Sequence, residues 1–332
     1  MLLVWRLTIW SAVVALVSCG YNTPEEIQEG KAALEGMRRE RKREEFAANR
    51  IFGGFQTHVG LYPFAVYLIT KDKQGYEDCS GSLVAPGWVL TARHCKGSGD
   101  WDAIVFAGDV DFSTDRVFTK INVQMRVAAT VSYYRPPTPD RLDHDIMLLH
   151  MYRAFEMISG FVGIIPVTEM RQYPEHFNER CTVVGFGLRG KDLKPETGIQ
   201  KGASFMMEPG PNCRFPGIDI NGLCTFDVAT KSVCRGDSGG PVFCKGEQIQ
   251  MGLVVGAKYK NCCFEWCGAP VWKNVHMFVG YYRDWIEDAI TPGARARASP
   301  NGSRGAGTPL LVSLTGLAAC LSSCSVNGPL FH

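Results

Sequence analysis

Apolar residues in this chain lie mostly in short runs, and many of them alternate with polar residues. Glycine, proline, asparagine and aspartate, which favour turns, separate one run from the next. Runs of this kind predict β-strands. The predicted strands are 64–70, 82–84, 88–91, 103–107, 117–128, 146–151, 181–186, 203–207, 241–244, 249–255 and 271–275. So many short strands indicate an all-β fold built from barrels or sandwiches.

Two segments have a helical pattern instead. One amphipathic helix follows the last predicted strand, and we expect it to be structural. Its apolar face carries Phe278, Tyr281, Tyr282, Trp285, Ile286 and Ala289. Near the other end of the chain, Thr23-Pro24-Glu25-Glu26 has the residues of a helix start: a capping hydroxyl, a proline in the first turn and a glutamate three residues after the cap.

The first 50 residues divide into two predicted parts. Residues 1–19 contain an early arginine and an apolar stretch from Leu7 to Val17, and small residues follow that stretch. This pattern is typical of a secretory signal peptide, and the stretch is too short to span a membrane. Residues 20–50 are polar and predict a pro-segment. Its basic run, 38–43, has two interpretations. It is a second processing site, or it has no such role and forms a solvated helix face or a flexible linker.

Composition narrows the class of protein. The chain has 332 residues, of which 45% are hydrophobic, so it can bury a large core. Its net charge of +2 argues against a nucleic-acid partner. Thirteen cysteines are typical of an oxidising compartment. We therefore expect a secreted, extracellular protein.

The most informative chemical motif is Gly236-Asp237-Ser238-Gly239-Gly240-Pro241, which sets a hydroxyl nucleophile in a glycine-rich bend. A serine needs a base and an orienting acid to react at neutral pH. His94 follows one predicted strand and is the candidate base; Asp145 precedes another and is the candidate acid. Asp143 and His144 flank that acid and compete for its assignment. The order His, Asp, Ser is that of the chymotrypsin group.

These residues resemble the trypsin/chymotrypsin-like (S1) family of serine proteases, over about residues 51–290. The resemblance implies two six-stranded antiparallel β-barrels with a C-terminal helix, and an active site in the cleft between the barrels. The run Arg50-Ile51-Phe52-Gly53-Gly54 resembles the activation site of the family zymogens. It implies that a cut after Arg50 frees the amino group of Ile51, which then pairs with Asp237.

The resemblance also implies a mechanism. Ser238 attacks a peptide carbonyl, His94 takes and returns the proton, and Asp145 orients the imidazole. The N–H groups of Gly236 and Ser238 stabilise the oxyanion. No metal and no organic cofactor is needed. The expected partners are protein or peptide substrates, an activating trypsin-like protease and, as further candidates, protein inhibitors.

Several positions depart from the trypsin pattern. The residue at the floor of the primary pocket, six before the nucleophile, is Ser232, where trypsin-like enzymes have aspartate. An uncharged floor predicts cleavage after apolar or aromatic residues, as in chymotrypsin-like or elastase-like enzymes. Val255-Gly256-Ala257 replaces the usual Ser-Trp-Gly of the substrate-pairing strand, and Arg93 replaces an alanine beside the histidine. These departures motivate an alternative function, a non-catalytic protease homologue that acts as a binding or regulatory module.

Disulfide pairing is implied by the resemblance alone. It gives Cys79–Cys95, Cys181–Cys244, Cys213–Cys224 and Cys234–Cys263. Cys262 and Cys267 are then left as a further local pair, and a zinc cluster in that loop is the competing interpretation. Asp109, Asp111 and Asp115 lie where some relatives bind calcium, and a solvated acidic loop is the favoured interpretation.

The C-terminal extension, residues 291–332, is predicted to lie outside the protease domain. Asn301-Gly302-Ser303 is an N-glycosylation sequon, and an apolar run follows over 309–326. Small residues, a short spacer and an apolar tail resemble a glycolipid-anchor signal. If the signal is used, the glycolipid anchor holds the protein at the cell surface, and this is the only way in which we expect the chain to reach a membrane. The alternative is a disordered or loosely packed extension.

Overall fold

The computed structural model describes residues 22–43, 54–96, 102–174, 176–187, 198–213, 217–225, 231–259 and 271–291. The predicted signal peptide, the Arg50–Ile51 junction, the cysteines at 262, 263 and 267, and the tail beyond 291 lie outside these ranges. Asn22–Pro292 form one compact unit, which is described below. None of the helices within the described ranges is long and apolar enough to cross a membrane.

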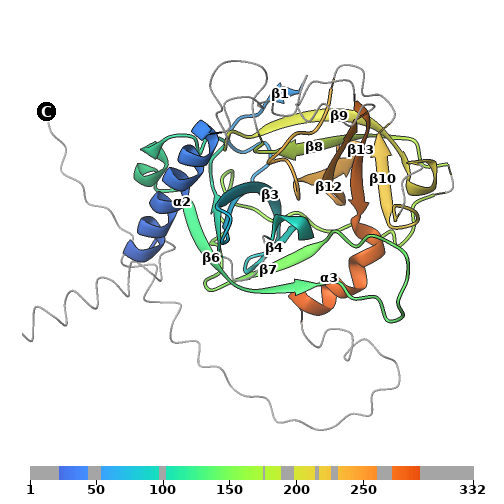
Figure 1. The fold of residues 1–332 in the computed structure, drawn as a ribbon, viewed down its shortest axis with the longest axis horizontal. Coiled ribbons are helices and arrows are strands. Elements are labelled where there is room, and N and C mark those ends of the chain that lie inside the picture. Colours follow the sequence, from blue (N-terminus) through green and yellow to red (C-terminus); the bar gives the residue numbers. More distant parts are fainter. Residues whose placement is uncertain are drawn as a thin grey trace, which may run out of the picture. The chain divides into compact units, whose positions relative to one another are not determined.

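Six antiparallel strands close the N-terminal barrel in the order β2-β3-β4-β7-β6-β5 (Figure 1). Every strand has two neighbours, so the ring leaves no unpaired sheet edge. Their bounds are β2 Ala65–Lys71, β3 Tyr76–Ala85, β4 Trp88–Thr91, β5 Asp102–Ala107, β6 Gln124–Tyr133 and β7 Met147–Met151. The alternating apolar residues meet inside the ring, and the core includes Val66, Leu68, Leu83, Val89, Val105 and Leu148.

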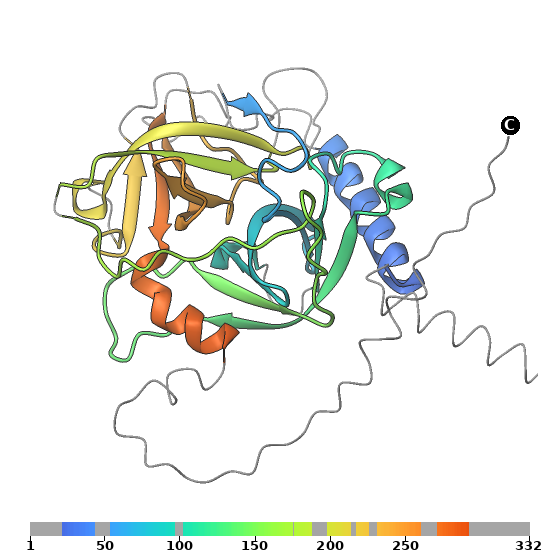
Figure 2. The ribbon, with the colours of Figure 1, turned by 180° about the vertical axis from the view of Figure 1, so that it is seen from behind.

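The second barrel follows the same plan (Figure 2). Its ring runs β8-β9-β10-β13-β12-β11 and closes where β11 pairs with β8. The bounds are β8 Glu179–Gly185, β9 Lys201–Pro209, β10 Gly222–Thr225, β11 Pro241–Cys244, β12 Gln250–Tyr259 and β13 Val271–Phe278. The short strand β1, Phe55–Gln56, adds to β9 outside the ring. The predicted all-β fold of two six-stranded antiparallel barrels is confirmed.

Three strand assignments differ from the sequence prediction. Strands β1 and β10 were not predicted: β1 has only two residues, and β10, Gly222-Leu223-Cys224-Thr225, has no alternating apolar pattern. The predicted strand 117–128 is wrong in its first half. Asp115–Thr119 forms a 3₁₀ helix, η2, and β6 begins only at Gln124. Val117 and Val123 are both buried, as residues of a strand would be. In this segment, however, a short helix and a turn bury them, and the apolar residues of the sequence do not distinguish the two cases.

The predicted C-terminal helix is present as α3, Arg283–Ile290, preceded by the 3₁₀ helix η4, Val279–Tyr282. Its apolar face packs against the barrels, with Tyr282 and Ile286 fully buried. The Tyr282 hydroxyl lies 3.0 Å from Asn221 Nδ2, which donates to it, and 3.0 Å from His144 Nδ1. The helix is structural, as predicted.

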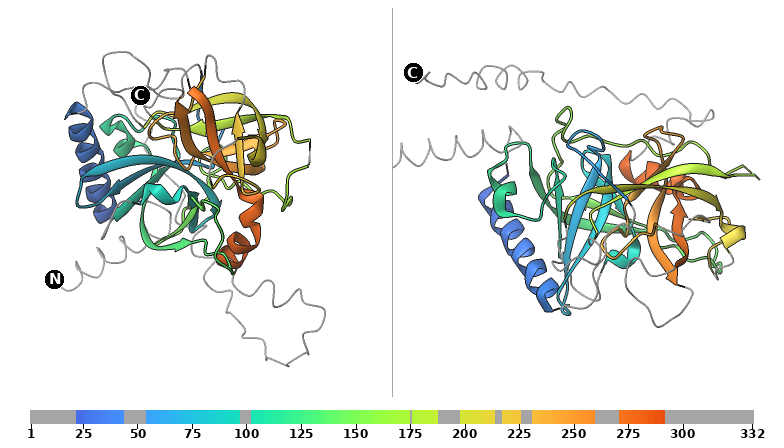
Figure 3. Two further views of the ribbon diagram at one scale, coloured as in Figure 1. Left: turned by 45° about the vertical axis from the view of Figure 1, so that its right-hand side comes forward. Right: turned by 90° about the horizontal axis from the view of Figure 1, so that it is seen from above.

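A long helix, α2 (Pro24–Arg43), precedes the first barrel (Figure 3). The predicted helix start is confirmed: the Glu26 N–H donates to Thr23 Oγ1 at 3.1 Å, and the Thr23 N–H donates to Glu26 Oε2 at 2.8 Å. The basic run at 38–43 continues the helix, so the linker interpretation is wrong. Arg39 is exposed, but Arg38 is half-buried and pairs with Asp115 at 2.8 Å.

Candidate active site

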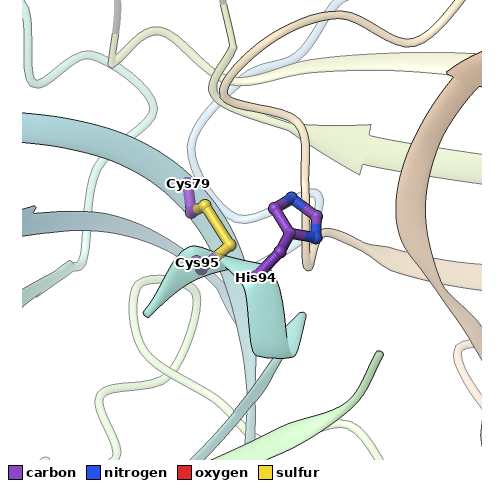
Figure 4. A group of neighbouring side chains, drawn as sticks. All are labelled: Cys79, His94 and Cys95. Carbon is purple, nitrogen blue, oxygen red and sulfur yellow. A yellow bond between two sulfur atoms is a disulfide. The ribbon is translucent and has the colours of Figure 1, made fainter. Parts of the chain in front are cut away.

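Strand β4 carries the candidate base to the end of the N-terminal barrel. After Thr91 the chain turns into the 3₁₀ helix η1, Arg93–Cys95. Cys95 forms a disulfide with Cys79 on β3, with an S–S distance of 2.05 Å. Figure 4 shows the disulfide that joins Cys79 on β3 to Cys95 on η1, with the His94 ring beside it. The loop that presents His94 is therefore fastened to a barrel strand.

Asp145 is the residue that holds His94. Its Oδ2 lies 2.6 Å from His94 Nδ1, and its Oδ1 accepts a hydrogen bond of 2.8 Å from the His94 main-chain N–H. The flanking residues are engaged elsewhere. His144 contacts Asp140 and Tyr282, and the main chain of Asp143 bonds to Gly217 and Asn221. Of these three residues, Asp145 is the one that contacts His94.

The imidazole is tuned by this contact. Desolvation alone would lower the pKa of His94, but the hydrogen bond and the negative charge of Asp145 outweigh it, and the net pKa is raised. Glu77 and Asp143 add smaller effects in the same direction. The His94 side chain remains about half exposed, at 47%. A half-exposed histidine with a buried carboxylate behind it can accept a proton from a neighbouring hydroxyl.

The nucleophile bend needs its glycines. Gly236 and Gly239 have φ angles of 89° and 81°, which are in the left-handed region. A Cβ at Gly239 would overlap the Thr91 hydroxyl and the Ser80 carbonyl oxygen. The bend also bonds to the first barrel, because the Ser80 N–H donates to the Ser238 carbonyl at 2.8 Å. The Ser80 hydroxyl donates to the Gly236 carbonyl at 2.7 Å.

Two groups in the bend are positioned for chemistry. The Ser238 hydroxyl donates to the carbonyl oxygen of Val255 at 3.4 Å, a long contact that a rotation of the side chain would break. Within the described part of the chain, the N–H groups of Gly236 and Ser238 have no hydrogen-bond acceptor. Free N–H donors beside a nucleophile are the requirement for an oxyanion hole.

Asp237 lies fully buried beneath the bend. Its Oδ1 accepts from the Gly187 N–H at 3.0 Å, and its Oδ2 accepts from the Cys234 N–H at 2.8 Å. A Cβ at Gly185 or at Gly187 would overlap this carboxylate. The glycines therefore form a cradle that fits the Asp237 side chain. Ile51, its predicted partner, lies outside the described residues.

The predicted pocket floor is buried. Ser232 is 1% exposed, and its hydroxyl has no hydrogen-bond partner among the described residues. Val255, Gly256 and Ala257 follow one another on β12 and are half-buried. The carbonyl oxygen of Val255 reaches the nucleophile, as noted above. The structure thus brings Ser238 and the predicted substrate-pairing strand together, and the residue at the predicted pocket floor is uncharged.

The sequence did not point to the polar residues that support this floor. The side chain of Asn274 accepts a hydrogen bond of 3.0 Å from the N–H of Val233, the residue after Ser232. Thr225 in turn accepts from the Asn274 N–H and Nδ2, at 3.0 and 3.1 Å. An asparagine inside the apolar run of β13 was the available signal. It indicates a buried polar group that needs partners.

Arg93 has an aromatic partner at the edge of the site. Its guanidinium lies 5.4 Å from the centre of the Tyr133 ring, within the range of a cation–π contact. The residue is exposed to solvent. The arginine therefore avoids the cost of burying an unpaired charge beside His94.

Three of the four predicted disulfides are present: Cys79–Cys95, Cys181–Cys244 and Cys213–Cys224. The expected partner of Cys234, Cys263, lies outside the described residues, as do Cys262 and Cys267. Cys79, His94 and Cys95 come close together, but both sulfurs are in the disulfide and cannot bind a metal as thiolates.

The predicted acidic loop is occupied by protein groups. Asp109 is buried and pairs with Lys120, and Asp115 pairs with Arg38. Asp111 accepts hydrogen bonds from the N–H and hydroxyl of Ser113, at 2.9 and 2.6 Å. Only the Asp115 side chain is largely exposed, at 74%. Lys120 and Arg38 thus supply positive charge to Asp109 and Asp115, and Ser113 gives Asp111 two neutral donors.

A paired histidine and aspartate beside a serine on a glycine bend, across two β-barrels, is the arrangement of a serine protease. The family model described as Trypsin matches residues 51–286. The chain belongs to the trypsin family. This membership and the matches below support a serine-type endopeptidase, a hydrolase.

Guinea-pig (Cavia porcellus) chymase is 28% identical over 247 residues, which cover 73% of this chain and 92% of the chymase. The human hepatocyte growth factor activator serine protease is 28% identical over 291 residues, or 82% of this chain. The match covers 41% of that human protein, and 38% of its dog (Canis lupus familiaris) counterpart. The solved structure of neuropsin, a serine protease of mouse brain, covers 72% of this chain and all of its own, at 22% identity and a TM-score of 0.57. That likeness shows the fold.

Proposed function

We propose that this chain is made as a zymogen and, once cut after Arg50, hydrolyses peptide bonds through His94, Asp145 and Ser238. The observation that carries the proposal is the double contact between Asp145 and His94, at 2.6 and 2.8 Å, beside a serine held on a glycine bend. Chance pairs of histidine and aspartate lack the nucleophile and the free N–H donors.

The mechanism follows from the positions of these groups. The Ser238 hydroxyl turns from the Val255 carbonyl towards His94 Nε2, which accepts its proton as Ser238 Oγ attacks the substrate carbonyl carbon. Asp145 fixes the tautomer with the proton on Nδ1 and stabilises the imidazolium that forms. The N–H groups of Gly236 and Ser238 donate to the oxyanion; removal of one such donor costs about 3–4 kcal/mol of transition-state stabilisation. His94 then returns the proton to the leaving amine, and water repeats the sequence on the acyl-enzyme.

Activation is proposed to act through Asp237. Its carboxylate is fully buried and accepts hydrogen bonds from the main-chain N–H groups of Gly187 and Cys234. A new amino group at Ile51 supplies the opposite charge that a buried carboxylate favours. The resulting ion pair is expected to fix Gly236 and Ser238 in the geometry that binds the oxyanion.

The substrate is proposed to carry an apolar or aromatic residue before the scissile bond. The buried, neutral hydroxyl of Ser232 supports this, because a lysine or arginine side chain would be desolvated at the floor with no charge to pair. Three disulfides and the N-terminal apolar stretch support secretion. A cell-surface form is proposed only if the tail directs a glycolipid anchor.

The test begins with the purified full-length precursor. It is cut after Arg50, and the new end, Ile-Phe-Gly-Gly, is verified by N-terminal sequencing. We expect a fluorophosphonate probe to label Ser238 after the cut and to label neither Ser238→Ala nor an uncut Arg50→Gln variant. Peptides varied at the residue before the cut then report specificity. No labelling of a folded protein with a free Ile51 end would overturn the proposal.

The alternative, a non-catalytic binding module, is not favoured. It was motivated by Arg93 and by Val255-Gly256-Ala257. Arg93 has a partner in Tyr133 outside the His94–Asp145 contact. The changed strand leaves a carbonyl oxygen 3.4 Å from the nucleophile and blocks none of the described contacts of the triad.

A further inference from the structure

Helix α2 contributes to the core of the N-terminal barrel. Ala33, Leu34 and Met37, spaced to share one face, are only 4%, 4% and 2% exposed. They pack in one cluster with side chains from β2, β5, η2 and β6, which include Ile69, Ile104, Phe106, Val117 and Met125. Figures 1 and 3 both show the helix lying along this barrel. Its departure would expose apolar surface of the barrel to water.

Two glycines let the helix come close. A Cβ at Gly30 would overlap the Met125 sulfur and lie 3.4 Å from the Phe106 ring. A Cβ at Gly36 would overlap the ring of Tyr76. Glycine weakens a solvated helix by about 1 kcal/mol relative to alanine. At these two positions it permits a contact between the helix backbone and the barrel that alanine would block.

The first turn of the helix partners a fully buried charge in the barrel. Arg126, on β6, has no exposed surface, and burial lowers its pKa to about 10. Its guanidinium lies 3.5 Å from the Glu26 carboxylate and donates to Asn22 Oδ1 at 3.2 Å. Glu26 also pairs with Arg153. The guanidinium of Arg126 also donates to the side chain of Gln124 and to the Ala154 carbonyl.

Asn22 extends this contact to the backbone of the barrel. Its Nδ2 donates to the Val123 carbonyl at 2.8 Å, and its Oδ1 accepts from the Met125 N–H at 2.7 Å. At the other end of the helix, Arg38 donates to Asp115 Oδ1 and to the Ser113 carbonyl, at 2.8 and 3.1 Å. The helix is therefore fixed at both ends and buried in the middle.

Once the predicted signal peptide, residues 1–19, is removed, the first cysteine of the chain is Cys79, so a cut after Arg50 leaves helix α2 with no disulfide to the protease domain. We propose that the helix nevertheless stays bound, and that the active enzyme consists of two non-covalently associated pieces. This inference rests on the proposed cut after Arg50, which lies beyond the end of α2 at Arg43. Release of the helix would take the Glu26 carboxylate away from the fully buried Arg126, and removing one partner of a buried ion pair is strongly unfavourable.

The test separates retention from activity. A recognition sequence for a highly specific protease replaces residues within 44–50 of the full-length chain, the chain is cut, and the pieces are followed by size exclusion and mass spectrometry. We expect the α2 piece to elute with the catalytic piece at micromolar concentration, and to separate in guanidinium without reductant. Elution of the α2 piece on its own under native conditions would overturn the proposal.

A matched pair of variants tests the stated cause. Glu26→Ala is expected to raise the dissociation constant of the α2 piece by on the order of 100-fold or more. Glu35→Ala removes the same charge from the solvent side of the helix, where the carboxylate is 67% exposed, and is expected to change it less than about threefold. If Glu26→Ala does not accumulate as folded protein, Asn22→Ala replaces it, with an expected rise of about tenfold. Equal dissociation constants for the Glu35→Ala variant and for the Glu26→Ala or Asn22→Ala variant would contradict the inference.

The outcome is distinguishable from that of the proposed function. Retention is measured by elution and mass, which require neither a free Ile51 end nor a reactive Ser238. A retained helix with no labelling of Ser238 would support the two-piece assembly and contradict the enzyme mechanism. A released helix with normal labelling of Ser238 would support the enzyme mechanism and contradict the two-piece assembly.

Discussion

The carboxylate of Asp145 contacts His94 at two points, Nδ1 at 2.6 Å and the main-chain N–H at 2.8 Å. The first contact fixes the tautomer of the ring. The second joins the carboxylate to the backbone of η1, so that Asp145 contacts both the ring of His94 and the turn that carries it. An amide at position 145 could keep the shape of this contact but would lose its charge.

Asp145→Asn is therefore expected to lower kcat by about 10⁴-fold, as loss of this acid does in other serine proteases. His94 must be neutral to take the proton of Ser238, so activity falls as the pH drops through its pKa. In the wild-type enzyme that pKa is raised, which places the acid limb of the pH–rate profile above pH 6.5. In the variant the limb should move to lower pH. A pH–rate profile with an unmoved limb would contradict the role given to the Asp145 charge.

Gly239→Ala should destabilise the fold and silence the site. The new Cβ would overlap Thr91 and Ser80, and the alanine would have to adopt a φ of 81°, which is unfavourable for any residue with a side chain. We expect a loss of about 3 kcal/mol or more in the free energy of unfolding, and loss of Ser238 labelling. Gly246→Ala is the matched control, since its φ is 76° but nothing lies within 4 Å of the added carbon. It should cost about 1 kcal/mol by urea unfolding and leave labelling intact.

Ser232→Asp should convert the specificity. A carboxylate at the buried floor offers a partner for lysine or arginine. We expect kcat/KM to rise at least tenfold for peptides with a basic residue before the cut, and to fall for apolar ones. Ser232→Asn adds the same volume without charge. If Ser232→Asn also came to prefer peptides with a basic residue before the cut, the charge of the aspartate would not be the cause of the changed specificity.

His276 should make the fold sensitive to acid. It is fully buried, neither ring nitrogen has a partner among the described residues, and burial lowers its pKa to about 3. The unfolded state binds a proton at about pH 6.5, so stability falls as the pH drops below that value, by up to about 1.4 kcal/mol per unit. Urea unfolding between pH 7 and pH 5 should show this loss. His276→Leu should remove it, whereas substitution of the exposed His58 should not.

The proposed catalytic residues could be named from the sequence because their signals are local. A histidine after one strand, an aspartate before another and a glycine bend can each be read within a few residues. The strands were predictable where apolar residues alternate. The prediction failed at 117–128, where a 3₁₀ helix buries Val117 and imitates that pattern.

The docking of α2 could not be predicted, because its determinants are distant in sequence. Glu26 and Arg126 are a hundred residues apart, and each looks like an ordinary surface charge in its own segment. The helix has few apolar residues, and its glycines look like helix breakers until Tyr76 and Met125 are seen against them. Asn274 was similarly hidden, because its partners Val233 and Thr225 come from other parts of the second barrel.

Ser80 belongs to the first barrel, yet its hydroxyl donates to the Gly236 carbonyl and accepts from the Phe186 N–H at 2.9 Å, both in the second. Its own N–H donates to the carbonyl of the nucleophile, Ser238. The two barrels are consequently not interchangeable parts. A chimera that took its first barrel from a relative without this hydroxyl would leave two main-chain groups beside the nucleophile unsatisfied, even with every triad residue retained.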